Sequence, residues 1–265
     1  MGIELNYKTF GQGEPLIILH GLFGMLDNWK SFARRLENDY LVITVDLRNH
    51  GKSPRDEEHN YRVMAEDISE FLDRNFLFEA HVLGHSMGAK VAMYLALEYS
   101  GKVKSLIAAD MGVKQYPGGH EYILETLSKT PVAKAKSRKE LHDFLKERLE
   151  LESIVQFLMK NLKRNKEDGG FEWKFQLDVL RNCYSEILAP VQSTHTFSGP
   201  TSFLMGGASH YLSEGDLPDI RRFFPEARLE IIPGAGHWIH ADAPEQTEEL
   251  VRAHLERAIN ERPDF

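Results

Sequence analysis

The chain has 265 residues, 42% of them hydrophobic, and a formal net charge of -8 at pH 7. This length and apolar content are enough for one large domain with a substantial core. The acidic excess argues against nucleic-acid binding, because phosphate recognition needs clustered lysine and arginine. Cys183 is the only cysteine, so no disulfide can form within the chain.

No targeting or membrane-spanning segment is predicted. The amino terminus lacks the basic segment and apolar stretch of a secretory signal. No apolar run approaches the roughly 20 residues that are needed to span a bilayer. We therefore expect no stable membrane insertion and a cytoplasmic location. The sequence does not indicate an oligomeric state.

Short apolar runs alternate with helix-like segments along the chain. The strand-like runs are 16–19, 41–45, 80–83, 105–109, 202–205 and 229–232, and the helix-like segments are 29–36, 63–72, 90–98 and one that begins at Pro244. This alternation predicts an α/β fold with a mostly parallel central sheet flanked by helices. In such sheets, sites lie at the carboxyl ends of the strands.

The segment from about residue 116 to 200 interrupts this regularity, and no strand is predicted in it. Residues 137–140 fit a capping box, and apolar residues at helical spacing follow from Leu141 to Leu151 and from Ile154 to Leu162. We predict a helical cap over residues 116–198, inserted between core segments 1–115 and 199–265. An oligomer interface or plain surface helices are the alternatives for this segment.

Residues 84–88 read Gly-His-Ser-Met-Gly between a predicted strand and a predicted helix. In that context G-x-S-x-G is typical of a nucleophile elbow. The sharp turn strains the backbone of its central residue, and the flanking glycines leave room for neighbouring backbone. Ser86 is therefore the predicted nucleophile. The alternative is an ordinary turn with a solvated serine.

A serine hydroxyl needs a base to take its proton. His237 fits, because it lies in a glycine-containing loop between the last predicted strand and the closing helix. Its neighbours in the pocket are predicted to include His85 and Trp238, although packing alone could explain both.

Negative charge that develops on a substrate oxygen needs backbone N–H groups directed at it. We predict that one comes from Met87, the residue after the nucleophile. The other is predicted to come from Leu22, in the glycine-containing loop 19–24 after an early strand. His20 is expected to hold this loop.

An acid should orient the histidine, and in the usual chain order it lies between the serine and the histidine. Asp110, Asp216 and Asp219 are the candidates. The commonest position, the turn after strand 202–205, contains Ser209 and no acid. Asp110 directly follows strand 105–109 at its carboxyl end, where a carboxylate can face inward, and is therefore preferred. Asp216 and Asp219 lie in a polar stretch that suits a helix start. Ser209 is predicted to hydrogen-bond to His237 or to Asp110.

These segments together resemble the α/β-hydrolase superfamily, and most of all the YbfF-type esterases and their ABHD11-like relatives. The segments that carry the resemblance are 19–24, 46–53, 84–88 and 236–238. In that branch the acid follows the strand after the nucleophile and a serine takes the usual acid position, which Asp110 and Ser209 match. The resemblance implies a triad of Ser86, Asp110 and His237 beneath a helical cap. It also implies hydrolysis of small-molecule esters or acyl thioesters, acyl-CoA included, with small to medium acyl groups.

Two other functions remain open. A lyase or synthase of the menaquinone-pathway kind uses a similar residue set as a base system, and cap arginines paired with a charged substrate would favour it. Arg138, Arg148 and Arg164 are available for this. A non-catalytic binding scaffold is the weakest alternative. No cofactor is expected, because residues 84–91 do not fit a phosphate-binding loop and the glycines at 11 and 13 precede their strand. No metal is expected, because His237 and His240 lack metal-ligand spacing and a third ligand.

Two charged residues after strand 41–45 are interpreted as structural. Asp46 and Arg48 belong to the same pattern as the segments that carry the resemblance, and we expect them to form an internal brace.

Overall fold

The computed structural model describes residues 2–166 and 169–260 of the chain. A seven-stranded sheet in the order β1-β3-β2-β4-β5-β8-β9 forms its centre. The strands are β1 (Tyr7–Phe10), β2 (Glu14–Leu19), β3 (Tyr40–Val45), β4 (Ala80–His85), β5 (Val103–Ala109), β8 (Thr201–Gly206) and β9 (Ala227–Ile232). All neighbouring pairs are parallel except β1 with β3. The predicted α/β fold is confirmed, and six of the seven strands coincide with predicted runs.

The seventh strand, β1, was not predicted. It lies at the edge of the sheet and is largely exposed. Its sequence, Tyr-Lys-Thr-Phe, therefore lacks the apolar run that marks a buried strand.

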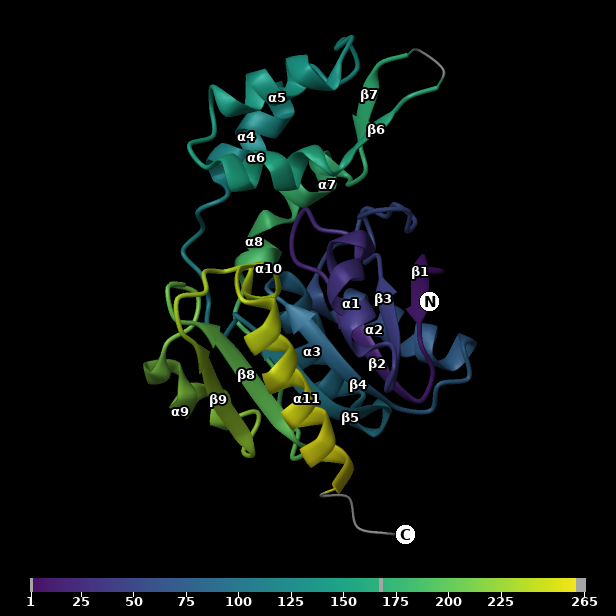
Figure 1. Ribbon diagram of the computed structural model, residues 1–265, viewed down its shortest axis with the longest axis vertical. Helices are drawn as coiled ribbons and strands as arrows, with labels where there is room; N and C mark the ends of the chain where they lie inside the picture. Colours follow the sequence, from purple (N-terminus) through teal and green to yellow (C-terminus); the bar gives the residue numbers. More distant parts are fainter. Residues whose placement is uncertain (1, 167–168, 261–265) are drawn as a thin grey trace.

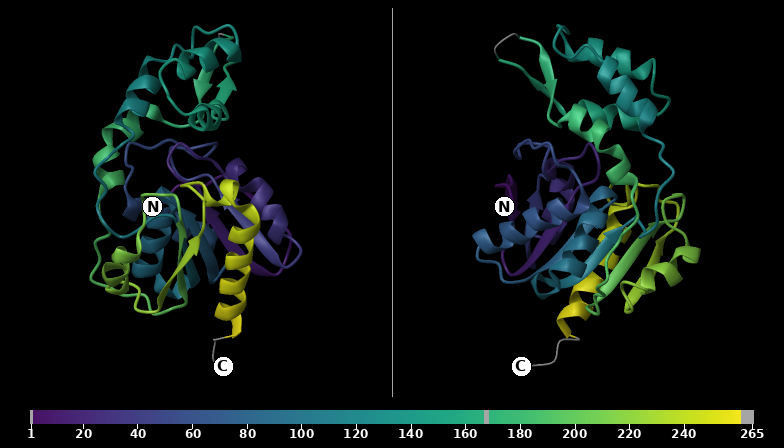
Figure 2. Two further views of the ribbon diagram at one scale, coloured as in Figure 1. Left: turned by 60° about the vertical axis from the view of Figure 1, so that its left-hand side comes forward. Right: turned by 180° about the vertical axis from the view of Figure 1, so that it is seen from behind.

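Each central strand buries side chains on both faces of the sheet. Along β2, Ile17 and Leu19 join one buried cluster, whereas Leu16 and Ile18 join the other. The first cluster includes α2 (Tyr61–Arg74) and α3 (Met87–Glu98), and the second includes α1 (Lys30–Leu36) and α11 (Pro244–Asn260). Figures 1 and 2 show these helices against the sheet.

Helix α3, which follows Ser86, is buried on every side. All residues from Met87 to Leu97 are buried, and they include the charged Lys90. The helix packs against both β4 and α2, which explains why its sequence is almost uniformly apolar. Shorter elements complete the core: η1 (Leu26–Trp29), η2 (Ser100–Lys102), η3 (Glu214–Asp216), α9 (Leu217–Arg221) and α10 (Ile239–Asp242).

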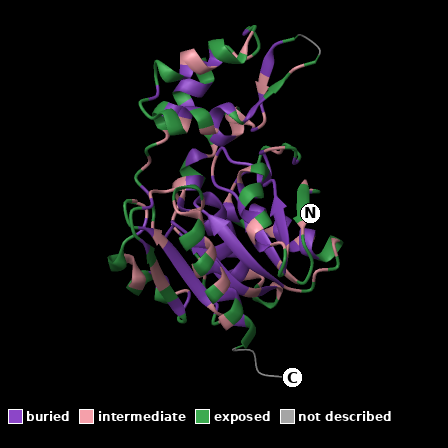
Figure 3. Cartoon of the chain, in the orientation of Figure 1, coloured by how far each residue is buried: buried purple, intermediate pink, exposed green. Residues whose placement is uncertain are grey.

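A second layer lies above the carboxyl edge of the sheet (Figures 1 and 2). It contains α4 (Glu121–Lys129), α5 (Arg138–Lys146), α6 (Glu152–Met159), α7 (Leu177–Asn182), α8 (Tyr184–Leu188), β6 (Leu162–Arg164) and β7 (Phe171–Trp173). We call this layer the cap. Its outer surface is largely exposed, and the sheet beneath it is buried (Figure 3). The proposed boundaries at residues 116 and 198 both fall in loops.

Two predictions for the cap are wrong. The segment does contain strands, because β6 and β7 form an antiparallel hairpin. The helix predicted through Leu162 ends at Met159, and Leu162 begins β6. Each strand has three residues, which is too short for a pattern with a period of two to be recognised.

The predicted capping box is half formed. The Ser137 hydroxyl accepts from the Glu140 N–H at 3.3 Å, as predicted. The Glu140 carboxylate instead accepts from the Lys136 N–H, one residue before the cap position.

None of the helices within residues 2–166 and 169–260 is long and apolar enough to cross a bilayer.

Candidate active site

Ser86 lies at a sharp turn between β4 and α3. Its backbone has φ 54° and ψ -120°, a conformation that is strained for a residue with a side chain. A Cβ on Gly84 would lie 2.1 Å from the Gly88 carbonyl oxygen, and one on Gly88 would lie 2.4 Å from that of Leu19. Both positions therefore require glycine. The local geometry is the one that the G-x-S-x-G pattern predicts.

Asp110 follows β5 directly, and its side chain is fully buried. Its Oδ2 lies 2.7 Å from His237 Nδ1. The Gly206 N–H donates to Oδ1 at 3.0 Å, and the Ser209 hydroxyl donates to Oδ2 at 2.5 Å. An ionised carboxylate only accepts, so His237 Nδ1 donates to it and Nε2 keeps its lone pair. Ser209 thus bonds to Asp110, the second of its two predicted partners.

The other two candidate acids lie elsewhere. Asp216 forms an ion pair with Lys114 at 2.8 Å and accepts from the Ser213 N–H. Asp219 lies in the first turn of α9, 3.7 Å from Arg222. Neither carboxylate contacts His237 in the hydrogen bonds of the described residues.

Two further residues hold His237 in place, one at its ring and one at its backbone. Tyr211 stacks on it with ring centroids 3.9 Å apart and planes inclined by 19°. His85 Nε2 lies 2.8 Å from the His237 carbonyl oxygen. Tyr211 was not predicted as a site residue. Its backbone N–H donates to the Ser209 hydroxyl. Its position two residues after Ser209 was therefore the sequence feature that could have placed Tyr211 near His237.

The loop after β2 runs directly against Ser86. A Cβ on Gly21 would lie 3.1 Å from Ser86 Cβ. In the part of the chain that the structure describes, neither the Leu22 N–H nor the Met87 N–H donates a hydrogen bond. Met87 is the first residue of α3, where N–H groups have no partner within the helix. Two unused backbone donors therefore lie in segments that adjoin Ser86.

His20 braces this loop. Its Nδ1 lies 2.8 Å from the Gly21 carbonyl oxygen, and its Nε2 accepts from the Leu47 N–H at 3.0 Å. Burial lowers the pKa of His20 to about 4, so the ring is neutral at pH 7 and can accept this bond.

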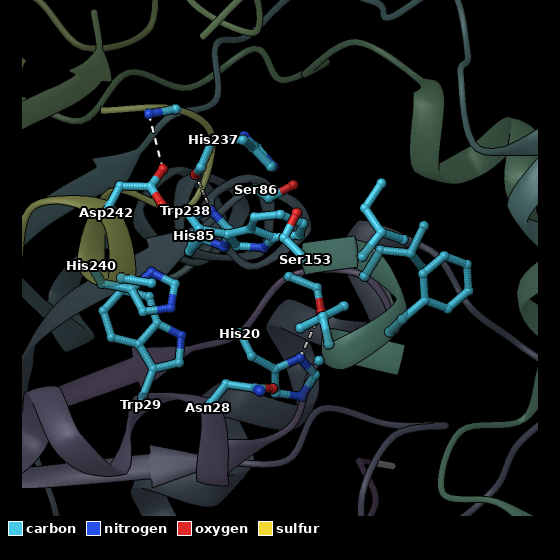
Figure 4. A pocket seen from close by; sticks show the side chains of 18 of the residues that line it. His20, Asn28, Trp29, His85, Ser86, Ser153, His237, Trp238, His240 and Asp242 are labelled. Atoms are coloured by element: carbon cyan, nitrogen blue, oxygen red, sulfur yellow. Dashed lines mark hydrogen bonds between the residues drawn. The ribbon is translucent and has the colours of Figure 1, made fainter. Parts of the chain in front are cut away.

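A cavity of about 840 Å³ lies between the core and the cap. Ser86 and His237 line its core side, and Ser153 of α6 lines its cap side (Figure 4). His85 and Trp238 line it as well, as predicted. Burial holds the pKa of His85 well below its usual range, so this side chain is a neutral part of the cavity wall that also contains Ser86.

A second aromatic pair on the cavity wall was missed. Trp29 and His240 stack with ring centroids 4.0 Å apart, and both line the cavity (Figure 4). Burial lowers the pKa of His240 to about 3. Among the described residues, no group of three or more His, Cys, Asp or Glu side chains is arranged to hold a metal ion.

A much smaller chamber of about 30 Å³ also adjoins Ser86. It is lined mainly by apolar and aromatic side chains, including Met87, Tyr116, Ile187 and Leu188. His237 lines the large cavity and is not among the residues that line this chamber.

Asp46 and Arg48 brace the fold, although they do not brace each other. Arg48 forms a two-pronged ion pair with Asp67 of α2, at 2.6 and 2.8 Å. Asp46 instead accepts from the N–H groups of Leu26 and Lys52.

Comparison with known proteins identifies the family of this chain. Residues 14–244 match the family described as alpha/beta hydrolase fold. Esterase YbfF of Escherichia coli is 37% identical, over 91% of this chain and 92% of that protein. The sn-1-specific diacylglycerol lipase ABHD11 of Danio rerio is 36% identical, over 91% of this chain and 79% of that protein. A solved structure of a marine microorganism esterase is 37% identical, has a TM-score of 0.93, and matches over 96% of this chain and 100% of that one.

The chain therefore belongs to the α/β hydrolase family. Within that family these three similar proteins carry the names of esterases and a lipase, which supports a hydrolase of the carboxylesterase type.

Proposed function

We propose that this protein is a serine carboxylesterase in which Ser86 is the nucleophile, His237 the base and Asp110 the acid that orients it. The observation that carries this proposal is the 2.7 Å contact between Asp110 and His237 Nδ1. It leaves Nε2 free to accept a proton, and Ser86, on a strained turn, lines the same cavity as His237. Leu22 and Met87 supply the oxyanion hole, which their unused N–H groups support.

In the proposed reaction, His237 takes the proton of Ser86 as the serine oxygen attacks the carbonyl carbon of an ester. The negative oxygen of the tetrahedral intermediate accepts from the two backbone N–H groups. His237 then protonates the leaving alcohol, and the acyl group stays on Ser86. Water attacks the acyl-enzyme by the same steps and releases the acid. An acyl thioester, acyl-CoA included, can follow the same course with a thiol as the leaving group.

The two spaces beside Ser86 suggest how a substrate lies. Because His237 protonates the leaving group, that group must lie on the His237 side, which is the large cavity. The acyl group then points toward the small chamber. The small size of this chamber favours small acyl groups, and medium ones would require it to widen. The predicted cytoplasmic location of the reaction stays a prediction.

The test is a panel of aryl esters and acyl-CoA thioesters of graded acyl length, with a diacylglycerol added because relatives are named for that substrate. We expect turnover by the natural protein. Ser86→Ala should lower the turnover rate by several orders of magnitude. The remaining rate should exceed that of the reaction in water by roughly 10³- to 10⁴-fold, because binding and the oxyanion hole remain. Undiminished turnover by Ser86→Ala would exclude the mechanism.

The lyase or synthase alternative loses its supporting feature. The three arginines considered for this role, Arg138, Arg148 and Arg164, do not line the large cavity. Arg138 donates to the Met159 and Leu162 carbonyls, Arg148 lies over the Phe144 ring, and Arg164 lies near the Phe171 ring. Arg138 thus joins α5 to the end of α6 and to β6, and the other two make contacts at the end of α5 or within the β6–β7 hairpin. If every acyl substrate of the panel failed, the lyase and scaffold alternatives would gain weight.

A further inference from the structure

Lys90 is a fully buried lysine on α3, one helical turn after Ser86. Among the described residues no carboxylate pairs with its ammonium group. Burial lowers the pKa of Lys90 to about 7. An apolar side chain of similar length would fill the space without this cost of desolvation. The presence of a lysine at this buried position must therefore be explained by the contacts of its ammonium group.

Those contacts reach both connections between core and cap. We define the entry stem as residues 113–116 and the exit stem as residues 188–191. Lys90 Nζ donates to the Lys114 carbonyl oxygen at 2.9 Å in the entry stem, and to the Ala189 carbonyl oxygen in the exit stem. The rings of Tyr116 and Tyr61 lie 4.9 and 5.5 Å from Nζ, within the range of cation–π attraction.

The two stems also bind each other. The Tyr116 N–H donates to the Leu188 carbonyl at 3.0 Å, and the Val191 N–H donates to the Val113 carbonyl at 2.8 Å. Tyr116 and Leu188 line the small chamber beside Ser86. A movement of either stem relative to α3 would therefore change the width of that chamber.

We infer that Lys90 is a positioning residue that fastens both cap stems to the nucleophile helix and so fixes the width of the chamber beside Ser86. The fastening itself follows from the hydrogen bonds and is independent of any activity. The consequence for acyl selectivity rests on the proposed function.

Amide hydrogen exchange tests the fastening directly. At pH 6, below the pKa of Lys90, the side chain is mostly charged. In Lys90→Met the two inter-stem amides, those of Tyr116 and Val191, should then exchange about 10- to 100-fold faster, the effect expected from losing a charged hydrogen-bond donor. Amides of β4 and β5 should keep their rates. If Lys90→Met does not fold, Lys90→Gln carries the test, because its amide still offers two N–H donors. The expected acceleration is then smaller.

Lys102→Met is the matched control. Lys102 also donates to a backbone carbonyl, that of Ser69 at 2.9 Å, and it lies near the carboxyl end of α3 in η2. Its replacement should leave the stem amides unchanged. Unaltered stem exchange in the Lys90 variants would overturn the inference. So would an acceleration shared by the β4 and β5 amides, because that would show only a general loss of stability.

Acyl selectivity tests the consequence. The ratio of kcat/KM for an aryl acetate to that for an aryl octanoate should fall several-fold in Lys90→Met, mainly through a lower KM for the octanoate. Faster stem exchange with an unchanged ratio would overturn the link to the chamber and leave the fastening intact. Absence of serine-dependent turnover in the natural protein would instead contradict the proposed function.

Discussion

Three different groups converge on the Asp110 carboxylate: a backbone N–H, a hydroxyl and an imidazole. The Gly206 N–H and the Ser209 hydroxyl fix the orientation of the carboxylate. The oriented carboxylate in turn holds the His237 ring. Removal of its charge should therefore affect the histidine more than the fold around it.

Asp110→Asn should lower kcat/KM on the best ester by about 10⁴-fold, because an amide no longer holds the productive tautomer of His237. Asp216→Asn is the control. Since Asp216 pairs with Lys114, this substitution should lower kcat/KM only slightly. Steady-state kinetics with folding checked by circular dichroism decides the matter. The opposite order of effects would transfer the acid role to Asp216.

Ser209→Ala removes one donor to the same carboxylate and keeps the contact with His237. We expect a loss in kcat/KM of about 10-fold, as one charge-assisted hydrogen bond is typically worth about 1.5–3 kcal/mol and the Gly206 N–H still remains. The loss should fall between those of Asp216→Asn and Asp110→Asn. A variant as active as the natural protein would show that Ser209 has no part in holding the acid.

At the level of elements, the elbow shows how closely β4, α3 and β2 approach one another. The G-x-S-x-G pattern predicts the type of turn, because glycine at both flanks lets the strand and the helix meet without a clash. It could not show that Gly88 touches the end of β2, because that contact joins segments about 70 residues apart.

Gly88→Ala would place its Cβ 2.4 Å from the Leu19 carbonyl oxygen. Since backbone must move to admit it, we expect a loss of at least about 1–3 kcal/mol in the free energy of unfolding. Gly101→Ala meets nothing within 4 Å and should be nearly neutral. Urea denaturation compares the two, and equal midpoints would show that the β2–α3 contact is looser than described.

The cap elements show where sequence patterns fail. Helices α5 and α6 have clear apolar faces and were predicted. The β6–β7 hairpin has strands of three residues, and its pairing depends on contacts across the turn. Local propensity does not specify such a hairpin.

Over the whole molecule, several neutral histidines are buried in the core, and another, His240, is partly buried on the cavity wall. Burial lowers the pKa of five of them to between about 3 and about 4; they are His20, His50, His59, His240 and His254. A histidine whose pKa is lower in the folded state contributes stability above the unfolded value near 6.5. That stability is lost as the pH falls toward the folded value.

We therefore expect stability to fall steeply below pH 6.5. Each such histidine adds about 1.4 kcal/mol per pH unit to the loss, so several together approach a typical domain stability of about 5–15 kcal/mol within roughly two pH units. Urea midpoints measured from pH 7.5 to 4 at constant ionic strength test this. A midpoint that stays constant across that range would contradict the neutral burial of these rings.

The sequence by itself determined the sheet, the elbow and the identity of Ser86, His237 and Asp110 as candidates, because these depend on local runs, glycine positions and chain order. Only the tertiary structure decided which acid meets His237, that Ser209 bonds to Asp110, that Tyr211 stacks on the histidine, and that Lys90 reaches both stems. The physical reason is the same in each case. A hydrogen bond or ring contact between residues far apart in sequence depends on how strands, loops and cap pack, and no local pattern records that packing.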